Sequence, residues 1–138
     1  MKIERMGPGD DERVIEAAHV FDNLPRADAV RRFLAEPNHH LFIAYSDDDP
    51  VGFISGAELT HPDKGTEMFL YELGVDDKHQ RQGFGIALVL ALADLARERG
   101  CYGMWVLTEE DNVAARATYS KAGGEAEGTP VIFTWRFV

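Results

Sequence analysis

The segment "FLYELGVDDKHQRQGFGIALVLALADLARERG", residues 69–100, joins a strand pattern, a glycine-containing turn and a long helix pattern. Its first seven residues are mostly apolar, as expected of a buried strand. From about Gly83 to Arg99 apolar residues recur on nearly every side of a helix, and Gly100 is suited to end it. We therefore expect a central strand, a turn and a crossover helix that is buried on most sides.

The rest of the chain supplies more strand and helix patterns around this unit. Two helix patterns precede it, separated by Pro25, and three strand patterns in succession form antiparallel hairpins. The predicted fold is mixed α/β (α+β), a single domain over 1–138 whose central mixed sheet has an antiparallel N-terminal half and a parallel crossover. Expected strands are 2–6, 40–46, 51–59, 67–75, 101–107 and 131–138, and expected further helices are 10–21, 26–36 and 112–123.

Composition excludes several classes of protein. The 138 residues suit one domain with one core, and a net charge of −10 argues against a nucleic-acid partner. The longest apolar run, residues 86–96, is about half the length of a membrane span, and the first residues lack the apolar region of a signal peptide. One cysteine, Cys101, and five histidines without ligand spacing predict no metal site. We expect a cytoplasmic protein without a membrane or nucleic-acid partner.

The turn "QRQGFG", residues 80–85, leads into the helix and has the features of an anion site. Glycines at 83 and 85 would let a phosphate approach the backbone, and the first helical turn offers free N–H groups at the positive end of the dipole. The lysine and serine or threonine of a Walker loop are absent, so the turn suits a diphosphate that is held but not cleaved. Alternatively, both glycines only permit close packing of helix and sheet.

A second motif lies about thirty residues downstream, where Asn112, Ala115 and Tyr119 stand in an N-x-x-A-x-x-x-Y pattern. Together with the [QR]-x-x-G-x-[GA] pattern of Gln80, Gly83 and Gly85, it resembles the GNAT superfamily of N-acetyltransferases. The order of the predicted elements matches as well. The resemblance implies acetyl-coenzyme A as cosubstrate and a sheet whose central strands splay apart to admit its thioester.

The resemblance also implies a role for each matching position. Backbone N–H groups of the turn would bind the pyrophosphate, the strand edge at 73–75 would pair with the pantetheine arm, and Asn112 would contact that arm. The implied coenzyme-binding residues are Leu73, Gly74, Val75, Gln80, Arg81, Gln82, Gly83, Phe84, Gly85, Ile86, Asn112, Ala115 and Tyr119.

Two side chains are candidates for proton transfer. The resemblance places Tyr119 near the coenzyme sulfur, where a phenol could protonate the leaving thiolate; alternatively, its ring only packs in the core. Glu72 stands within a strand that is otherwise almost wholly apolar, and a partly buried carboxylate with a raised pKa suits a general base. Alternatively, Glu72 is a structural carboxylate paired with an arginine.

Acidic residues at 109–111 point to a cationic acceptor. Glu109, Glu110 and Asp111 directly precede Asn112 and should line the acceptor side of the cleft, where they would attract ammonium groups together with Glu72. Residues 67–96, with 40–59 before them, are similar to the aminoglycoside 3-N-acetyltransferase (gentamicin-type) branch, which implies a polycationic antibiotic as acceptor. A polyamine, a protein lysine or a protein N-terminus would also fit, and a coenzyme-binding sensor without catalysis is the alternative from another class.

The last strand pattern, 131–138, alternates apolar side chains at Val131, Phe133, Trp135 and Phe137. These side chains either face the core of the same chain or mediate pairing of two chains. A homodimer is therefore one possible state, and it is also common in the family that the sequence resembles.

Overall fold

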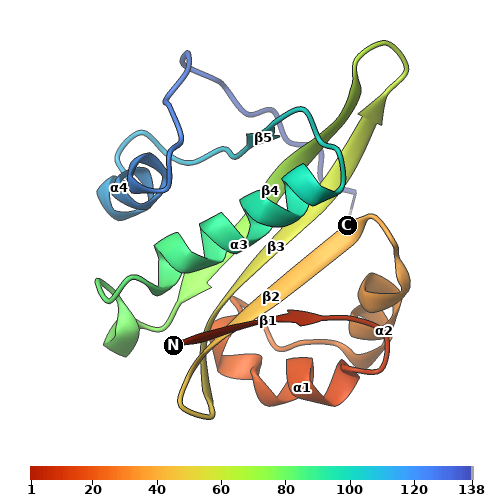
Figure 1. The fold of residues 1–138 in the computed structure, drawn as a ribbon, viewed down its shortest axis with the longest axis vertical. Helices are drawn as coiled ribbons and strands as arrows, with labels where there is room; N and C mark the ends of the chain where they lie inside the picture. Colours follow the sequence, from red (N-terminus) through yellow and green to blue (C-terminus); the bar gives the residue numbers. More distant parts are fainter. Residues whose placement is uncertain (138) are drawn as a thin grey trace.

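The computed structural model describes residues 1–137, and its elements follow the predicted order in most of the chain (Figure 1). Strand β1 and helices α1 and α2 come first, then three strands, helix α3, a short fifth strand and helix α4. The bounds are β1 Lys2–Met6, α1 Asp11–Glu16, η1 Ala18–Val20, α2 Ala27–Ala35, β2 His39–Ser46, β3 Asp49–His61, β4 Gly65–Val75, η2 Asp77–His79, α3 Phe84–Glu98, β5 Met104–Trp105 and α4 Val113–Lys121.

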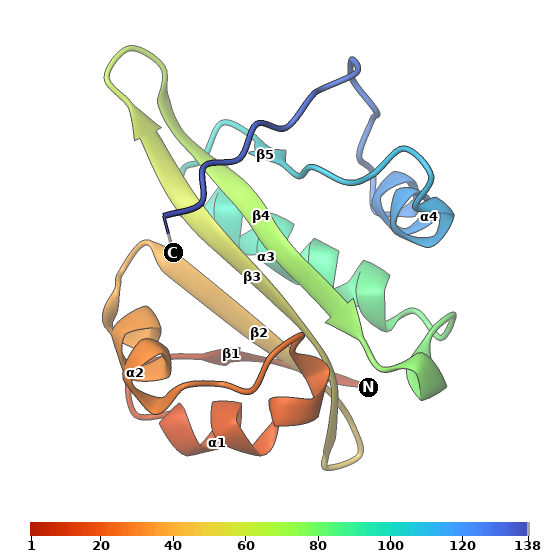
Figure 2. The same ribbon diagram turned by 180° about the vertical axis from the view of Figure 1, so that it is seen from behind.

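The five strands form one sheet in the order β1-β2-β3-β4-β5. The first three pairings are antiparallel and the pairing of β4 with β5 is parallel, because α3 carries the chain back across the sheet between them. Helix α3 crosses one face of the sheet in Figure 1, and the strands stand in front of it in the opposite view of Figure 2. The predicted mixed α/β fold with an antiparallel N-terminal half is confirmed.

The core is divided between the two faces of the sheet. One cluster joins α1 and α2 to the sheet through residues such as Val14, Leu34 and Phe53, and the other joins α3 to it through Leu88 and Leu92. Helix α3 is buried or half-buried over most of residues 84–96, as its apolar pattern predicted. Leu90, at 44% exposure, is the apolar exception in that span.

Strands β4 and β5 are neighbours over only two residue pairs, Met68 with Met104 and Phe69 with Trp105. Just beyond these pairs, β4 contains a bulge, because Ser55 of β3 pairs with Glu72 and Gly56 pairs with Leu70. Tyr71 is thus the extra residue, and a bulge bends its strand and increases its twist. The remainder of β4 therefore continues along β3 without a neighbour on its β5 side, which agrees with the splayed central strands that the resemblance implied.

Three predicted elements differ from the structure. The helix expected over 10–21 is divided into α1 and η1, and the strand expected over 101–107 is reduced to Met104–Trp105. The strand expected over 131–138 is wrong for the described part, since residues 131–137 have no regular secondary structure, and Val138 lies outside the described residues. The expected alternation remains in the sequence, but these side chains are exposed, so they do not face the core of their own chain.

A buried histidine links strands β1, β2 and β3 to the end of α3. His40 of β2 is almost fully buried; its Nδ1 accepts a hydrogen bond from Arg5 at 2.9 Å and its Nε2 lies 2.6 Å from Glu58. Arg99, next to the end of α3, contacts the same carboxylate. Because a guanidinium can only donate, Nδ1 must accept and the proton stays on Nε2. Burial lowers the pKa of His40 against the opposing effect of Glu58.

We predict that the free energy of unfolding falls as the pH drops below about 6.5, the ordinary pKa of histidine. The lowered pKa keeps His40 neutral in the folded chain, so the unfolded chain binds more protons there and stability is lost toward acid, by at most about 1.4 kcal/mol per pH unit. Urea unfolding between pH 7.5 and 5 measures this. His40→Gln should be less stable at pH 7.5 but show a flatter pH dependence, and an equally steep dependence in that variant would contradict the assignment.

Candidate functional site

The turn before α3 is braced by hydrogen bonds from its own side chains. Gln80 Nε2 donates to the carbonyl of Val75 at 3.3 Å and to Asp77 at 3.2 Å, and Gln82 Nε2 donates to the carbonyl of Lys78 at 3.3 Å. Gly83, at the N-cap of α3, has a φ of 89°, a left-handed conformation that glycine adopts without strain. The two glutamines therefore brace the turn, and the backbone remains the part that can face a ligand.

The N-terminus of α3 lacks the groups that usually satisfy a helix start. No side chain caps it and its first turn contains no acidic residue. Its first intrahelical hydrogen bond runs from the N–H of Ala87 to the carbonyl of Gly83 at 3.0 Å, which leaves the N–H groups of residues 84–86 without intrahelical partners. Those groups and the positive end of the helix dipole attract an anion such as a pyrophosphate.

Gly85 has a packing role as well. A Cβ built at this position would lie 3.3 Å from Cγ2 of Thr118 on α4 and 3.9 Å from Cγ2 of Val75 on β4. A side chain there would press α4 away from α3. The sequence left open whether the glycines serve packing or an anion; for Gly85 the structure gives a packing reason, whereas Gly83 is required by its backbone conformation.

The free edge of β4 begins beside this helix start. Leu73, Gly74 and Val75 pair with β3 on one side and have no strand partner on the other among residues 1–137. The carbonyl of Val75 accepts from Gln80, and extended backbone without a neighbouring strand can still accept an added chain in the manner of a further strand. The edge at 73–75 and the N-terminus of α3 thus form a continuous backbone surface where the sequence predicted the pantetheine and pyrophosphate.

Glu72 lies on the sheet face opposite α3. Burial raises its pKa, and the negative charge of Asp22, after η1, raises it further. No arginine or lysine forms an ion pair with Glu72 among the described residues, so the alternative of a structural salt bridge has no support. Ser55, its register partner on β3, is buried, and Ser55 Oγ has no hydrogen-bond partner among residues 1–137.

Tyr119 of α4 packs against the α3-side core cluster, which also includes Leu73, Val75 and Phe84. Burial raises the pKa of its hydroxyl above the ordinary value, so the phenol stays protonated at neutral pH and can donate a proton. The ring therefore packs in the core, as the simpler interpretation held, and the same burial preserves the proton that a general acid needs.

Asn112 is the N-cap of α4. Its Oδ1 accepts a hydrogen bond from the N–H of Ala115 at 3.1 Å. The pattern N-x-x-A in the sequence thus has a local structural cause, since asparagine is among the best helix-capping residues. The amide Nδ2 of Asn112 is not used by this bond and remains the group that could contact a ligand.

Several aromatic residues beside Glu72 were not predicted as site residues. The rings of Phe69 and Trp105 lie 4.4 Å apart and those of Phe69 and Tyr71 lie 5.4 Å apart, measured between centroids. Phe69 and Trp105 are register partners where β4 and β5 meet, and Tyr71 is exposed at the bulge. Period-two patterning could place Phe69 opposite the core face, but the bulge that exposes Tyr71 has no sequence signal.

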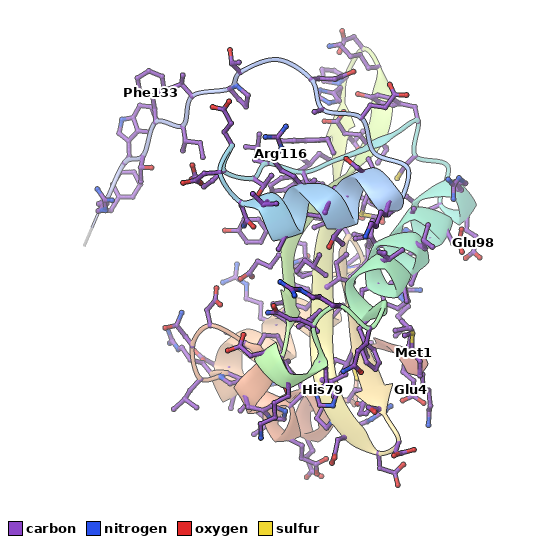
Figure 3. All side chains as sticks on the ribbon, turned by 90° about the vertical axis from the view of Figure 1, so that its left-hand side faces the viewer. Met1, Glu4, His79, Glu98, Arg116 and Phe133 are labelled. Carbon is purple, nitrogen blue, oxygen red and sulfur yellow. The ribbon has the colours of Figure 1, made fainter. Side chains whose placement is uncertain are left out.

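The acidic residues 109–111 line an open hollow of about 350 Å³, and that lining includes neither Glu72 nor Tyr119. The loop is held to α4 by Arg116, labelled in Figure 3, which donates to the carbonyl of Glu110 at 2.9 Å. All three side chains are exposed. These three carboxylates thus lie on a surface that does not include Glu72 or Tyr119. Their role in acceptor binding stays a prediction.

This geometry agrees with comparisons to known proteins. Residues 11–124 match the acetyltransferase (GNAT) family, so the chain belongs to that family. The mycothiol acetyltransferase of Nocardia farcinica is 32% identical over 139 aligned residues, which cover 85% of this chain and 42% of that protein. Human N-acetyltransferase 8 is 26% identical over 110 residues, covering 79% of this chain and 48% of that protein. The chain spans about half the length of these curated relatives.

Solved structures support the fold. An aminoglycoside acetyltransferase from an uncultured soil metagenomic sample, in complex with sisomicin, superposes with a TM-score of 0.89 at 23% identity, over 99% of this chain and 95% of that one. AAC(6')-Iy in complex with the bisubstrate analogue CoA-S-monomethyl-acetylneamine has a TM-score of 0.83 at 18% identity, over 98% of this chain and 97% of that one. At these identities the likeness establishes the fold.

Two features of the described residues bear on metal ions and membranes. Within the described residues 1–137, no group of three or more His, Cys, Asp or Glu side chains is placed to hold a metal ion. In the same part of the chain, none of the helices combines the length and apolar character that crossing a membrane requires.

We predict that Asn112→Ala lowers the free energy of unfolding by about 1 kcal/mol, because the N–H of Ala115 loses its cap. Asn112→Ser keeps an oxygen for this bond and should stay close to wild-type stability in urea unfolding. The serine variant lacks the amide Nδ2, so its affinity for coenzyme A isolates the ligand contact from the cap. An alanine variant as stable as the wild type would contradict the capping role.

Proposed function

We propose that this chain transfers an acetyl group from acetyl-coenzyme A to a primary amine of a small polycation, with an aminoglycoside as the preferred acceptor. The observation that carries the proposal is the uncapped N-terminus of α3 directly beside the free edge of β4. Membership of the GNAT family supports the same cosubstrate, and AAC(6')-Iy is a structural neighbour solved with coenzyme A.

The residues present fit the coenzyme. The N–H groups of residues 84–86 would bind its pyrophosphate, and the turn of Arg81, Gln82 and Gly83 would support them. The edge at 73–75 would pair with the pantetheine arm and so direct the thioester into the gap that opens after the two β4–β5 residue pairs. The acetyl thioester supplies an activated carbonyl that an amine can attack directly, with no enzyme nucleophile.

Proton transfer would involve both faces of the sheet. Glu72 is the proposed base, because its raised pKa lets it take a proton from the incoming ammonium, directly or through water. Tyr119 is the proposed acid for the leaving thiolate, because its raised pKa keeps the phenol protonated. Acid and base would therefore act from opposite sides of the splayed strand.

The acceptor would bind on the face of β4 that carries Glu72. Asp22 adds a second carboxylate there, and the exposed Tyr71 and Trp105 rings can pack over an ammonium or a sugar ring. Glu109, Glu110 and Asp111 would attract the same polycation over longer range. The 3-amino group is the position implied by the gentamicin-type resemblance, and the sisomicin complex of a structural neighbour supports the substrate class only by analogy.

A thiol-release assay with acetyl-coenzyme A tests the function. The amines are gentamicin-like aminoglycosides, polyamines and basic peptides with free N-termini, each at the same concentration. We expect release with aminoglycosides, followed by product analysis by NMR to distinguish 3-N from 6'-N acetylation. Release only with polyamines or peptides would replace the proposed acceptor. Binding of coenzyme A without release by any amine would favour a sensor.

Tyr119→Phe should reduce turnover by more than tenfold, since positioned proton transfer contributes roughly 10²–10⁴-fold to a rate. The ring still packs in the core, so stability and affinity for coenzyme A should change little. Steady-state kinetics together with calorimetric titration of coenzyme A measure both effects. Unchanged turnover would remove Tyr119 from the mechanism.

Glu72→Gln should flatten the acidic limb of the pH–rate profile, because the rate rises as this carboxyl loses its proton. The raised pKa places that limb above the ordinary range of glutamate. Asp22→Asn is the matched variant: without the neighbouring negative charge the pKa of Glu72 falls, and the limb moves to lower pH while burial keeps part of the shift. A profile that neither variant alters would rule out Glu72 as the base.

A further inference from the structure

The sheet face opposite α3, which is turned toward the viewer in Figure 2, carries aromatic rings along β4 and β5. Met68 and Met104, register partners on these strands, pack on the α3 side. By alternation Phe69 and Trp105, the next pair, project from the opposite face. Trp105 is 39% exposed and Tyr71 66%. Rings that served only the core would be enclosed, so this apolar surface is available to a ligand.

Glu67 is the charged residue beside these rings. It precedes Phe69 by two positions on β4, so it projects from the same face. The Tyr102 hydroxyl donates to Glu67 Oε2 at 2.6 Å, and His61 Nε2 lies 3.3 Å from Oε1. The hydrogen bond from Tyr102 lowers the pKa of Glu67 against the opposing effect of burial, and contacts with His61 and the indole N–H of Trp105 lower it further. The carboxylate is therefore charged at neutral pH, and its side chain is still 18% exposed.

The contact with Glu67 helps to fix the indole ring of Trp105. The same ring packs on Phe69, with 4.4 Å between centroids and 31° between the ring planes. A ring held by packing and by a hydrogen bond from its N–H has little rotamer freedom left to lose when a ligand binds. Trp105 is thus a preorganised aromatic surface with a negative charge at its edge.

Glu67 and Glu72 lie at opposite ends of these rings along β4. Their register partners on β3 are Leu59 and Ser55, four residues apart, which corresponds to about 13 Å at roughly 3.3 Å per residue. Among residues 1–137, neither carboxylate has a lysine or arginine within ion-pair distance. The pKa is lowered at Glu67 and raised at Glu72. Glu67 therefore suits a lasting ion pair, whereas Glu72 suits proton transfer.

We propose that Trp105 and Glu67 form a distal acceptor subsite, where a second cationic sugar ring of an aminoglycoside packs on the indole and its ammonium group pairs with Glu67. The inference rests on the proposed function, because it takes the reacting amine to lie at Glu72. The indole supplies both apolar contact area and a negative ring face that attracts cations. An acceptor must then reach both carboxylates, which a single ring cannot do, so the subsite selects acceptors by length.

Steady-state kinetics with acetyl-coenzyme A tests this selection. Gentamicin, which has several linked rings, is compared with 2-deoxystreptamine, its central ring alone. Glu67→Gln should raise KM for gentamicin about tenfold or more with little change in kcat, because a hydrogen bond to a charged group is lost away from the reacting amine. KM for 2-deoxystreptamine should not change. Asp63→Asn, which removes an exposed carboxylate from the turn between β3 and β4, is the matched control and should leave both KM values unaltered.

The fluorescence of Trp105 tests the subsite without acetyl transfer. Trp135→Phe leaves Trp105 as the only tryptophan of the chain. With saturating coenzyme A, which has no acetyl group to transfer, gentamicin should alter the emission saturably, and Glu67→Gln should raise the Kd about tenfold. The single ring of 2-deoxystreptamine and the ringless polycation spermine should alter the emission less.

The two experiments separate failure of the subsite from failure of the reaction. An unchanged KM for gentamicin in Glu67→Gln, or the same increase in Asp63→Asn, would overturn the subsite and leave acetyl transfer in place. Emission that gentamicin does not alter, or that spermine alters equally, would overturn it as well. Saturable binding of gentamicin at Trp105 without turnover would support the subsite and contradict the proposed reaction.

Discussion

The divergence of β4 from β5 is the constraint on which the site depends. Two residue pairs join these strands, and the bulge at Tyr71 then turns β4 away. A complete parallel pairing would satisfy the backbone of Leu73–Val75 and leave no edge for a ligand. The bulge has two effects at the candidate site. It leaves the backbone of β4 without a second strand partner next to the uncapped start of α3, and it places Glu72 on the sheet face opposite that helix.

The two helices at the candidate site differ in whether a side chain caps their first backbone N–H groups. α4 begins with a side-chain cap from Asn112, whereas α3 begins at a left-handed glycine with no cap and no acidic residue in its first turn. Both helices meet where Gly85 lets Thr118 approach. The free N–H groups of α3 are thus held beside Tyr119 by packing that a side chain at position 85 would disturb. The proposed coenzyme site and the proposed acid therefore depend on the same packing.

The parts of the fold that depend on local pattern could be predicted from the sequence. Apolar periodicity and glycine or proline boundaries identified β1 to β4, α2, α3 and α4, and the paired motifs identified the family. The short β5, the division of α1 from η1 and the bulge at Tyr71 depend on how distant segments pair, which periodicity does not report. The alternating pattern at 131–137 predicted a strand that these residues do not form, because alternation alone does not supply a neighbouring strand.

Residue roles divide in the same way. The raised pKa of Glu72 was predictable from a carboxylate in an apolar strand, but the contribution of Asp22 required the fold, since it lies fifty residues earlier in the chain. Ser55 and the rings around Phe69 were missed because nothing in their local sequence separates them from ordinary strand residues. Gln80 and Gln82 were assigned to the coenzyme, and in the structure their side chains brace the turn.

The central claim is that the start of α3 and the free edge of β4 together hold coenzyme A. Titration of the ¹⁵N-labelled chain with coenzyme A, followed by backbone amide chemical shifts, tests it most directly. We predict the largest shifts at residues 83–86 and 73–75, with smaller changes at β1 and α2. Saturable binding that leaves both segments unmoved would contradict it.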